Sequence, residues 1–267
     1  MCSLFAMSSQ IPQHATFSLL EAPRSLLKQS YANADGWGMA FHQENGRAPE
    51  SADPVEHARS LNLSAYVKEP VAAHTSQWFM HGAQAVRTRA LIVHLRHKTI
   101  GDRSEANTQP FGGFVALAHN GGLGGRWHRR LRAAIADPEL QPRGATSGEL
   151  LWGWLEQLIR TRFTPWNDDT QAFERAVIDE LLRPMLVEPD GIRSANFVMG
   201  HGETLHAFRF APKSHNKLYF LSRRRSVLVS SIPLSDEAWH ELPNGSLLTA
   251  KGARYRITRV TRAYDTG

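Results

Sequence analysis

Residues 89–96 read RALIVHLR and residues 114–119 read FVALAH, and these two apolar segments decide the fold class. Apolar side chains occupy successive positions in both, as in strands that are buried on both faces. Working outward, the sequence predicts further strands at 2–7 and 37–42 on the N-terminal side. On the C-terminal side it predicts strands over 196–199, 204–210, 218–221, 226–231, 246–250 and 254–260.

Helical spacing appears in blocks of its own. Residues 123–136, 147–162 and 169–186 have apolar side chains three or four positions apart, and Pro23 favours the start of a helix that runs to about Ala32. Strands come in runs and helices come in runs, which favours a layered α+β fold with antiparallel sheets over alternating βαβ units. Turn signals at Asn45-Gly46 and Asn244-Gly245 predict hairpins, whereas residues 49–85 have no clear pattern.

Composition limits the function classes. The net charge is +6 with a pI of about 9.8, which suggests acidic partners. Basic clusters lie at 126–132, 223–225 and 251–262, but no RRM, KH, zinc-finger or helix-turn-helix pattern accompanies them, so nucleic-acid binding is disfavoured. No apolar run approaches the roughly 20 residues of a membrane span, and no signal peptide is evident, so we expect a cytoplasmic protein.

Cys2 is the only cysteine of the chain, and its position directly after Met1 draws attention. Ser3 follows, and a small second residue permits removal of the initiator methionine. The thiol and a free α-amine would then belong to one residue, and the amine can serve as the general base of a nucleophile. The alternative interpretation is a terminal cysteine with no role.

Two other segments supply what an acyl-transfer reaction needs. Residues 119–122, His-Asn-Gly-Gly, follow an apolar strand and offer the Asn120 side-chain amide and the Gly121 backbone N–H as oxyanion donors. Arg96 ends another apolar strand, where a guanidinium can hold a carboxylate through two parallel hydrogen bonds. Alone, these segments fit an ordinary turn and a surface ion pair equally well.

Metal chemistry is disfavoured. His94 and His97 are three residues apart, and His201 and His206 are near each other, but neither pair has a further ligand at a familiar spacing. We therefore expect no metal and no cofactor.

Five segments in a fixed order resemble those of class II glutamine amidotransferases, which are N-terminal-nucleophile hydrolases. They are the terminal cysteine, a DGWG turn, an HxRxxTxG strand end, an N-x-x-P-F segment and an HNG turn; here these are Cys2, Asp35–Gly38, His94–Gly101, Asn107–Phe111 and His119–Gly121. The C-terminal Ser230–Leu234, Trp239 and Leu242–Gly245 resemble the stand-alone branch, which includes YafJ-like proteins and the ergothioneine-pathway γ-glutamyl hydrolase. The resemblance covers nearly the whole chain and implies one domain over residues 2–267.

The resemblance implies a four-layer αββα sandwich with two antiparallel sheets. It also implies that Cys2 attacks the γ-carbonyl of glutamine or of a γ-glutamyl amide, and that Asn120 and Gly121 stabilise the oxyanion. Arg96 and Thr99 would hold the substrate α-carboxylate. The remaining substrate-binding positions implied by the resemblance are Trp37, Gly38, Ser147 and Glu149.

This chain departs from the family pattern at the ammonium-binding segment. The family usually has an aspartate where this chain has Ser147, within Thr146-Ser147-Gly148-Glu149. A hydroxyl holds an ammonium less well than a carboxylate does, and Glu149 is a candidate to compensate. Gln109 replaces the commoner histidine, and Lys98 adds a charge beside the strand end.

Three function hypotheses follow. The first is a stand-alone amidohydrolase that acts on glutamine or on a γ-glutamyl conjugate, with ammonia either released or passed to a separate synthase subunit. The second is a catalytically inactive relative that binds a ligand or a partner, which Ser147 favours and the presence of Cys2, Arg96, Asn120 and Gly121 opposes. A basic nucleic-acid-binding module is a third hypothesis that rests on charge alone.

Overall fold

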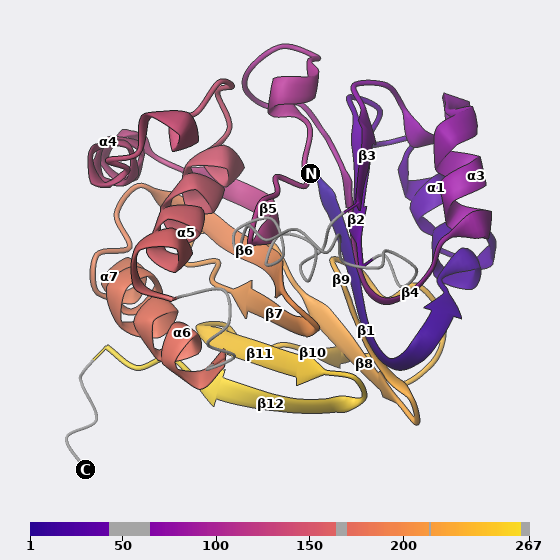
Figure 1. Cartoon of the computed structure of the whole chain (residues 1–267). Helices are drawn as coiled ribbons and strands as arrows, with labels where there is room; N and C mark the ends of the chain where they lie inside the picture. The colour runs from indigo at the N-terminus through magenta and orange to yellow at the C-terminus, as the bar shows by residue number, and fades with distance from the viewer. Residues whose placement is uncertain (43–64, 164–169, 214, 263–267) are drawn as a thin grey trace, which may run out of the picture.

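Two antiparallel β-sheets lie face to face in the computed structural model, which describes residues 1–42, 65–163, 170–213 and 215–262 (Figure 1). The first sheet has seven strands, and β1 is flanked by β9 and β4. Its order is β10 (His240–Glu241), β8 (Tyr219–Arg223), β9 (Ser226–Ser230), β1 (Ser3–His14), β4 (Arg87–Leu95), β2 (Trp37–Phe41) and β3 (Ala65–Glu69).

The second sheet has five strands, with β5 at one edge and β12 at the other. Its order is β12 (Arg254–Arg259), β11 (Ser246–Lys251), β7 (Thr204–Arg209), β6 (Ile192–His201) and β5 (Ala116–Leu123). Every pairing in both sheets is antiparallel.

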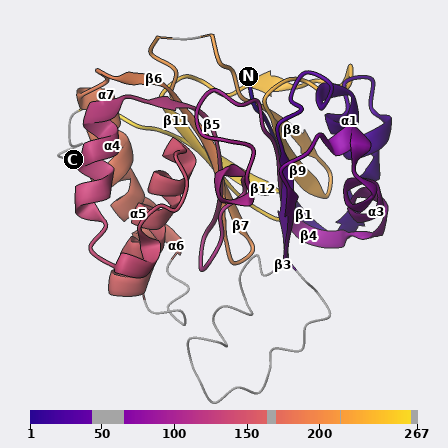
Figure 2. The ribbon, with the colours of Figure 1, turned by 90° about the horizontal axis from the view of Figure 1, so that it is seen from above.

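Helices cover the outer face of each sheet, as the view from above shows (Figure 2). On the seven-stranded sheet lie η1 (Phe17–Glu21), α1 (Leu26–Gln29), η2 (Ala73–Thr75) and α3 (Gln77–Ala85). On the five-stranded sheet lie α4 (Gly125–Ala134), α5 (Ser147–Arg162), α6 (Thr170–Val177), η5 (Ile178–Leu182) and α7 (Arg183–Val187). Short 3₁₀ turns, η3 (Glu105–Asn107) and η4 (Pro138–Leu140), lie in the connections.

The alternation of side chains along each strand produces three hydrophobic cores. In β1, Leu4 and Ala6 face the other sheet, whereas Phe5 and Met7 face the α1–α3 layer. In β5, Ala116 and Ala118 join the inter-sheet core and Leu117 packs toward the α4–α7 layer. Alanines and branched aliphatic residues therefore share the interface between the sheets, whereas most of the buried aromatic residues lie in the two helix–sheet interfaces.

The α+β class and the two antiparallel sheets between helices are confirmed. Three local expectations need correction. The predicted helix from Pro23 to Ala32 forms only the short α1 (Leu26–Gln29), preceded by the π-helical turn η1 (Phe17–Glu21). The segment 119–122 is not a turn after a strand, because β5 continues through it to Leu123.

The Asn244-Gly245 turn exists, with a positive φ of 75° at Gly245, but it joins β10 of one sheet to β11 of the other and so closes no hairpin. The turn predicted at Asn45-Gly46 lies outside the described residues. Within the described part of the chain, no helix combines the length and the apolar character that crossing a bilayer requires.

Candidate active site

Cys2 lies at the start of β1, a strand flanked by hydrogen-bonded neighbours on both sides. Ser3 pairs with Leu95 of β4, and Leu4 accepts a hydrogen bond from the Ser231 N–H after β9. The half-buried thiol of Cys2 accepts a hydrogen bond from the His97 N–H at 3.3 Å. Met1 precedes it and is 67% exposed, so the peptide bond between the two residues is near solvent.

The segment Asp35-Gly36-Trp37-Gly38 fixes the loop that carries this N–H donor. The Asp35 N–H donates to the Arg96 carbonyl at 3.0 Å, and the Arg96 N–H donates to the Gly36 carbonyl at 2.7 Å. The Asp35 carboxylate accepts from the Lys98 N–H at 2.7 Å and from Arg103 Nε at 2.6 Å. The DGWG turn therefore clamps the end of β4, a structural role that its sequence alone did not reveal.

Arg96 is buried beside the thiol. Its side chain belongs to a residue only 3% exposed, and its Nη1 and Nη2 donate to the carbonyls of Asp102 (2.6 Å) and Ile100 (2.9 Å). Burial lowers the pKa of Arg96, and the charge of a Cys2 thiolate opposes that shift. The Arg96 charge in turn favours the thiolate, against the larger effect of burial, which raises the pKa of Cys2. The guanidinium thus holds the loop after β4 and places a positive charge next to Cys2.

Asn120 reaches Cys2 from the opposite sheet. Its Nδ2 donates to the Cys2 carbonyl at 2.6 Å, although the two residues are 118 positions apart in the chain. Gly121 follows in β5, where it pairs with Ala195 of β6. A Cβ at Gly121 would come within 2.0 Å of the Ser194 carbonyl oxygen, so the close packing of β5 on β6 requires glycine there.

Burial dominates the acidity of the thiol. Removal from water raises the pKa of Cys2, and this outweighs the lowering by the His97 N–H, the chain terminus and Arg96. The thiol therefore keeps its proton at neutral pH unless a base takes it. A nucleophile at this position needs a general base, and among the described residues no histidine ring is hydrogen-bonded to Sγ.

Three further predicted residues have different surroundings. The Trp37 indole packs against Phe79 in the hydrophobic core between the seven-stranded sheet and the α1–α3 layer, and it donates to Glu69 at 3.2 Å. Its side chain therefore points away from the face of the sheet that meets the other sheet. Gly38 lies on the inner face, where an added Cβ would come within 2.4 Å of the Gln109 carbonyl oxygen. Thr99 is exposed in the loop after Arg96.

Ser147 and Glu149 lie at the start of α5, and both have partners inside the protein. The Ser147 hydroxyl accepts from the Leu123 N–H at 3.3 Å and lies 2.8 Å from His128 Nε2. The buried Glu149 carboxylate accepts from the N–H groups of Arg143 (2.8 Å) and Gly144 (2.7 Å). None of these hydrogen bonds involves Cys2.

Asn107 joins these loops, and sequence reasoning assigned it no such task. Its Nδ2 donates to Asp102 Oδ1 at 2.6 Å and to Ser104 at 3.0 Å, while its Oδ1 accepts from the Ala145 N–H at 2.8 Å. The loop held by Arg96 and the loop before α5 are thereby tied together. Among the residues described, no three His, Cys, Asp or Glu side chains gather as metal ligands.

Comparison with known proteins decides the family. Residues 1–224 match the model of the class-II glutamine amidotransferases. The chain belongs to this family. In this class II amidotransferase fold, Cys2 and Arg96 adjoin strands of the seven-stranded sheet, and Asn120 reaches them from the five-stranded sheet.

Relatives of this amidotransferase-family chain include enzymes and solved structures. It is 25% identical to a gamma-glutamyl-hercynylcysteine sulfoxide hydrolase of Mycobacterium tuberculosis, over 92% of this chain and 91% of that protein. A glutamine aminotransferase class-II domain protein of Silicibacter pomeroyi has the same fold, with a TM-score of 0.61, 20% identity, and coverage of 97% and 99% of the two chains. The glutamine phosphoribosylpyrophosphate amidotransferase of B. subtilis shares the fold with a TM-score of 0.59 at 14% identity, and the match covers 98% of this chain but 50% of that one.

Proposed function

We propose that this protein is a hydrolase of γ-glutamyl amides, with Cys2 as its nucleophile once Met1 has been removed. The observation that carries the proposal is the convergence of the Cys2 thiol, the Arg96 guanidinium and the Asn120 amide from β1, the end of β4 and β5. The exposure of Met1 gives an aminopeptidase access to the bond that must be cleaved.

In the proposed reaction, the freed α-amine of Cys2 takes the thiol proton and Sγ attacks the γ-carbonyl carbon of the substrate. One N–H of the Asn120 amide is bound to the Cys2 carbonyl, which leaves the second to donate to the oxyanion together with the Gly121 N–H. The carbon–nitrogen bond then breaks, and ammonia or an amine leaves with the proton from the α-ammonium. Water hydrolyses the thioester, which yields glutamate and regenerates the thiol.

Substrate binding is assigned to the residues around this centre. Arg96 has N–H donors beyond those given to Ile100 and Asp102, and with Thr99 it is proposed to hold the α-carboxylate. The Gly38 backbone, Ser147 and Glu149 are proposed to line the rest of the subsite, whereas Trp37 contributes by fixing the strand. The likeness to a gamma-glutamyl-hercynylcysteine sulfoxide hydrolase supports γ-glutamyl conjugates, in addition to glutamine, as proposed substrates of this protein.

The alternative function is a catalytically inactive relative that binds a ligand or a partner subunit. The observation in its favour is that Ser147 and Glu149 already satisfy hydrogen bonds within the protein. The site would then offer no carboxylate to the ammonium group of a γ-glutamyl substrate.

Glutamate release separates the two functions. The purified protein is incubated with glutamine and with γ-glutamyl thioether conjugates, and free glutamate is measured against a Cys2→Ala control. The hydrolase releases glutamate from at least one of these substrates and the control releases none. No release from any of them would contradict the hydrolase and favour the binding protein.

A further inference from the structure

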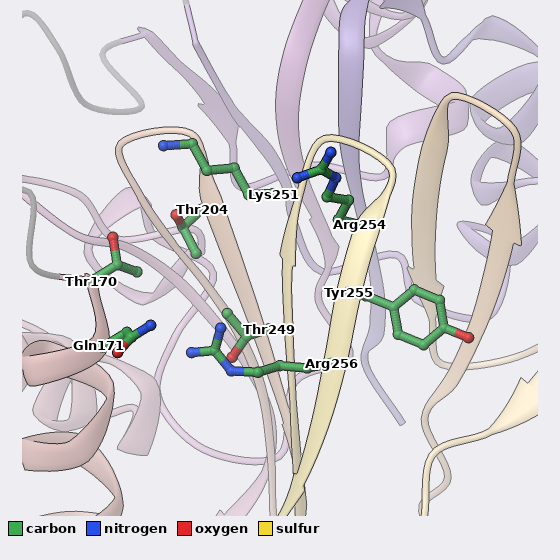
Figure 3. A pocket seen from close by; sticks show the side chains of 8 residues that line it. All are labelled: Thr170, Gln171, Thr204, Thr249, Lys251, Arg254, Tyr255 and Arg256. Atoms are coloured by element: carbon green, nitrogen blue, oxygen red, sulfur yellow. The ribbon is translucent and has the colours of Figure 1, made fainter.

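A basic cavity lies between α6 and the β11–β12 hairpin (Figure 3), and the proposed reaction does not use its residues. Its volume is about 460 Å³, within the size range of small-molecule sites. β12 is the edge strand opposite β5, which carries Asn120, so most of the five-stranded sheet separates the cavity from the candidate active site. The lining residues are Thr170, Gln171, Thr204, Thr249, Lys251, Arg254, Tyr255 and Arg256.

Two rows of side chains cross the sheet at this cavity. In the inner row, His206, Thr249 and Arg256 are neighbours across β7, β11 and β12. Glu174 of α6 neutralises this row, because its carboxylate accepts from Thr249 Oγ1 and Arg256 Nη2, each at 2.6 Å. The inner row is therefore a closed polar network beneath the cavity.

The outer row has no such carboxylate. Thr204, Lys251 and Arg254 are neighbours across the same three strands, and Lys251 lies directly opposite Arg254. Neither cation makes an ion pair with any residue that the structure describes. Glu203, next to Thr204 in the chain, pairs instead with Arg89 at 3.2 Å. Like charges in opposed positions of a β-ladder destabilise the pairing, so this row is arranged at a cost that a bound anion would offset.

One further cation lines the cavity, across which Thr170 and Gln171 of α6 face the hairpin (Figure 3). Arg256 adds a third cation, whose side chain is 49% exposed even though it contacts Glu174. Three cations therefore line a concave site of limited volume, and one of them contacts a carboxylate.

We propose that this cavity, named here the hairpin site, binds a small anion with two or more negative charges, carried on phosphate or carboxylate groups. Lys251 and Arg254 bind the anionic groups, and the Thr204 hydroxyl supplies a further hydrogen-bond donor. The concave site has a volume of about 460 Å³, which suits a small molecule better than an extended polymer.

Isothermal titration calorimetry tests the hairpin site with inorganic pyrophosphate and, separately, with citrate at low ionic strength. We expect one equivalent of at least one anion to bind, more weakly as salt is added. Binding of pyrophosphate alone identifies phosphate groups as the ligand chemistry, and binding of citrate alone identifies carboxylates. The Lys251→Gln/Arg254→Gln double variant should bind about tenfold more weakly or worse, since each charge-assisted contact contributes on that scale.

Arg129→Gln is the matched control, because Arg129 is an exposed arginine of α4, outside the cavity lining. It should leave the affinity unchanged. The Tm of the Lys251→Gln/Arg254→Gln variant without ligand should be equal to or above that of the unsubstituted protein, since a like-charge contact is removed. The proposal is overturned if neither anion binds, if only a single-stranded oligonucleotide binds, or if the double variant binds as tightly as the control.

Discussion

The Arg96 guanidinium has two roles in this structure. It donates to the carbonyls of Ile100 and Asp102, which fixes the loop after β4, and its charge acts on the Cys2 thiol. A guanidinium can do both because its donors diverge in a planar fork, whereas an ammonium is a single point charge. Residue identity at this position therefore affects the geometry of the loop and, under the proposed function, substrate binding as well.

Replacing Arg96 by Lys tests the carboxylate role. We expect Arg96→Lys to raise KM about tenfold while kcat falls by about threefold or less, because charge is kept and bidentate geometry is lost. Steady-state kinetics of glutamate release give both constants. Arg103→Lys, which alters an exposed partner of Asp35, is the control and should change neither constant appreciably. A fall in kcat with an unchanged KM for Arg96→Lys would contradict the assignment.

Replacing Asn120 by Asp tests the oxyanion role. The substitution keeps the side-chain shape but removes the Nδ2 donor and adds a negative charge where the oxyanion would form. We expect kcat to fall by about 10²–10³ with KM changed little. A near-normal kcat would remove Asn120 from the mechanism, and unfolding curves of both proteins verify that the variant is folded.

At the residue scale, the family resemblance carried by the five ordered segments implied that Cys2, Arg96 and Asn120 serve one site. The structure brings these three residues together. The sequence did not indicate the partners of Ser147, because His128 reaches its hydroxyl only through the packing of α4 beside α5. Likewise, the indole of Trp37 is committed to the core beside the α1–α3 layer by strand alternation, a detail that the DGWG pattern does not specify.

Among the elements, β5 carries the constraint most directly relevant to catalysis. Gly121 and Gly122 are adjacent in this strand, yet their surroundings differ sharply. A Cβ on Gly121 would overlap the Ser194 carbonyl oxygen at 2.0 Å, whereas one on Gly122 would lie 3.8 Å from its nearest neighbour, Arg193 Cβ. The two glycines form a matched pair for substitution.

We expect Gly121→Ala to lower the free energy of unfolding by about 2 kcal/mol or more, because β5 must separate from β6 to admit the methyl group. Gly122→Ala should change it by about 0.5 kcal/mol or less. Chemical denaturation of the three proteins measures both values. Equal effects of the two substitutions would show that β5 does not pack on β6 as described.

The elements also show what sequence patterns miss. Apolar runs identified β4 and β5, but β5 extends through two glycines that read as a turn, because the ladder with β6 outweighs their weak strand preference. The hairpin site draws its residues from α6, β7 and the β11–β12 hairpin, and only the pairing of strands brings them together. The sequence showed residues 251–262 as a basic cluster, but it did not indicate that several of these residues line a cavity.

Across the whole molecule, burial keeps several histidines neutral. Removal from water lowers the pKa of His94 to about 3, of His119 to about 4 and of His206 to about 3. In the unfolded chain each would titrate near 6.5. The stability contributed by their neutral forms is therefore complete above pH 6.5 and is lost as pH falls below it, toward the folded-state values.

We expect the free energy of unfolding to fall steeply between about pH 6 and pH 4.5, by about 1.4 kcal/mol per pH unit for each such histidine. The Asp35 carboxyl, whose pKa is lowered from 3.8, contributes only at lower pH. Urea denaturation across this range gives the slope. In His206→Gln the glutamine can still hydrogen-bond to Thr249. The slope of the free energy of unfolding against pH should fall by about 1.4 kcal/mol per pH unit, which corresponds to one proton. An unchanged slope would refute the assignment for His206.

The claim that Cys2 is a processed N-terminal nucleophile is tested most directly by intact mass spectrometry with a γ-diazoketone analogue of glutamine. The account predicts a chain that lacks Met1 and gains one equivalent of the analogue at Cys2, with no addition to Cys2→Ala. Retention of Met1, or equal labelling of Cys2→Ala, would contradict it.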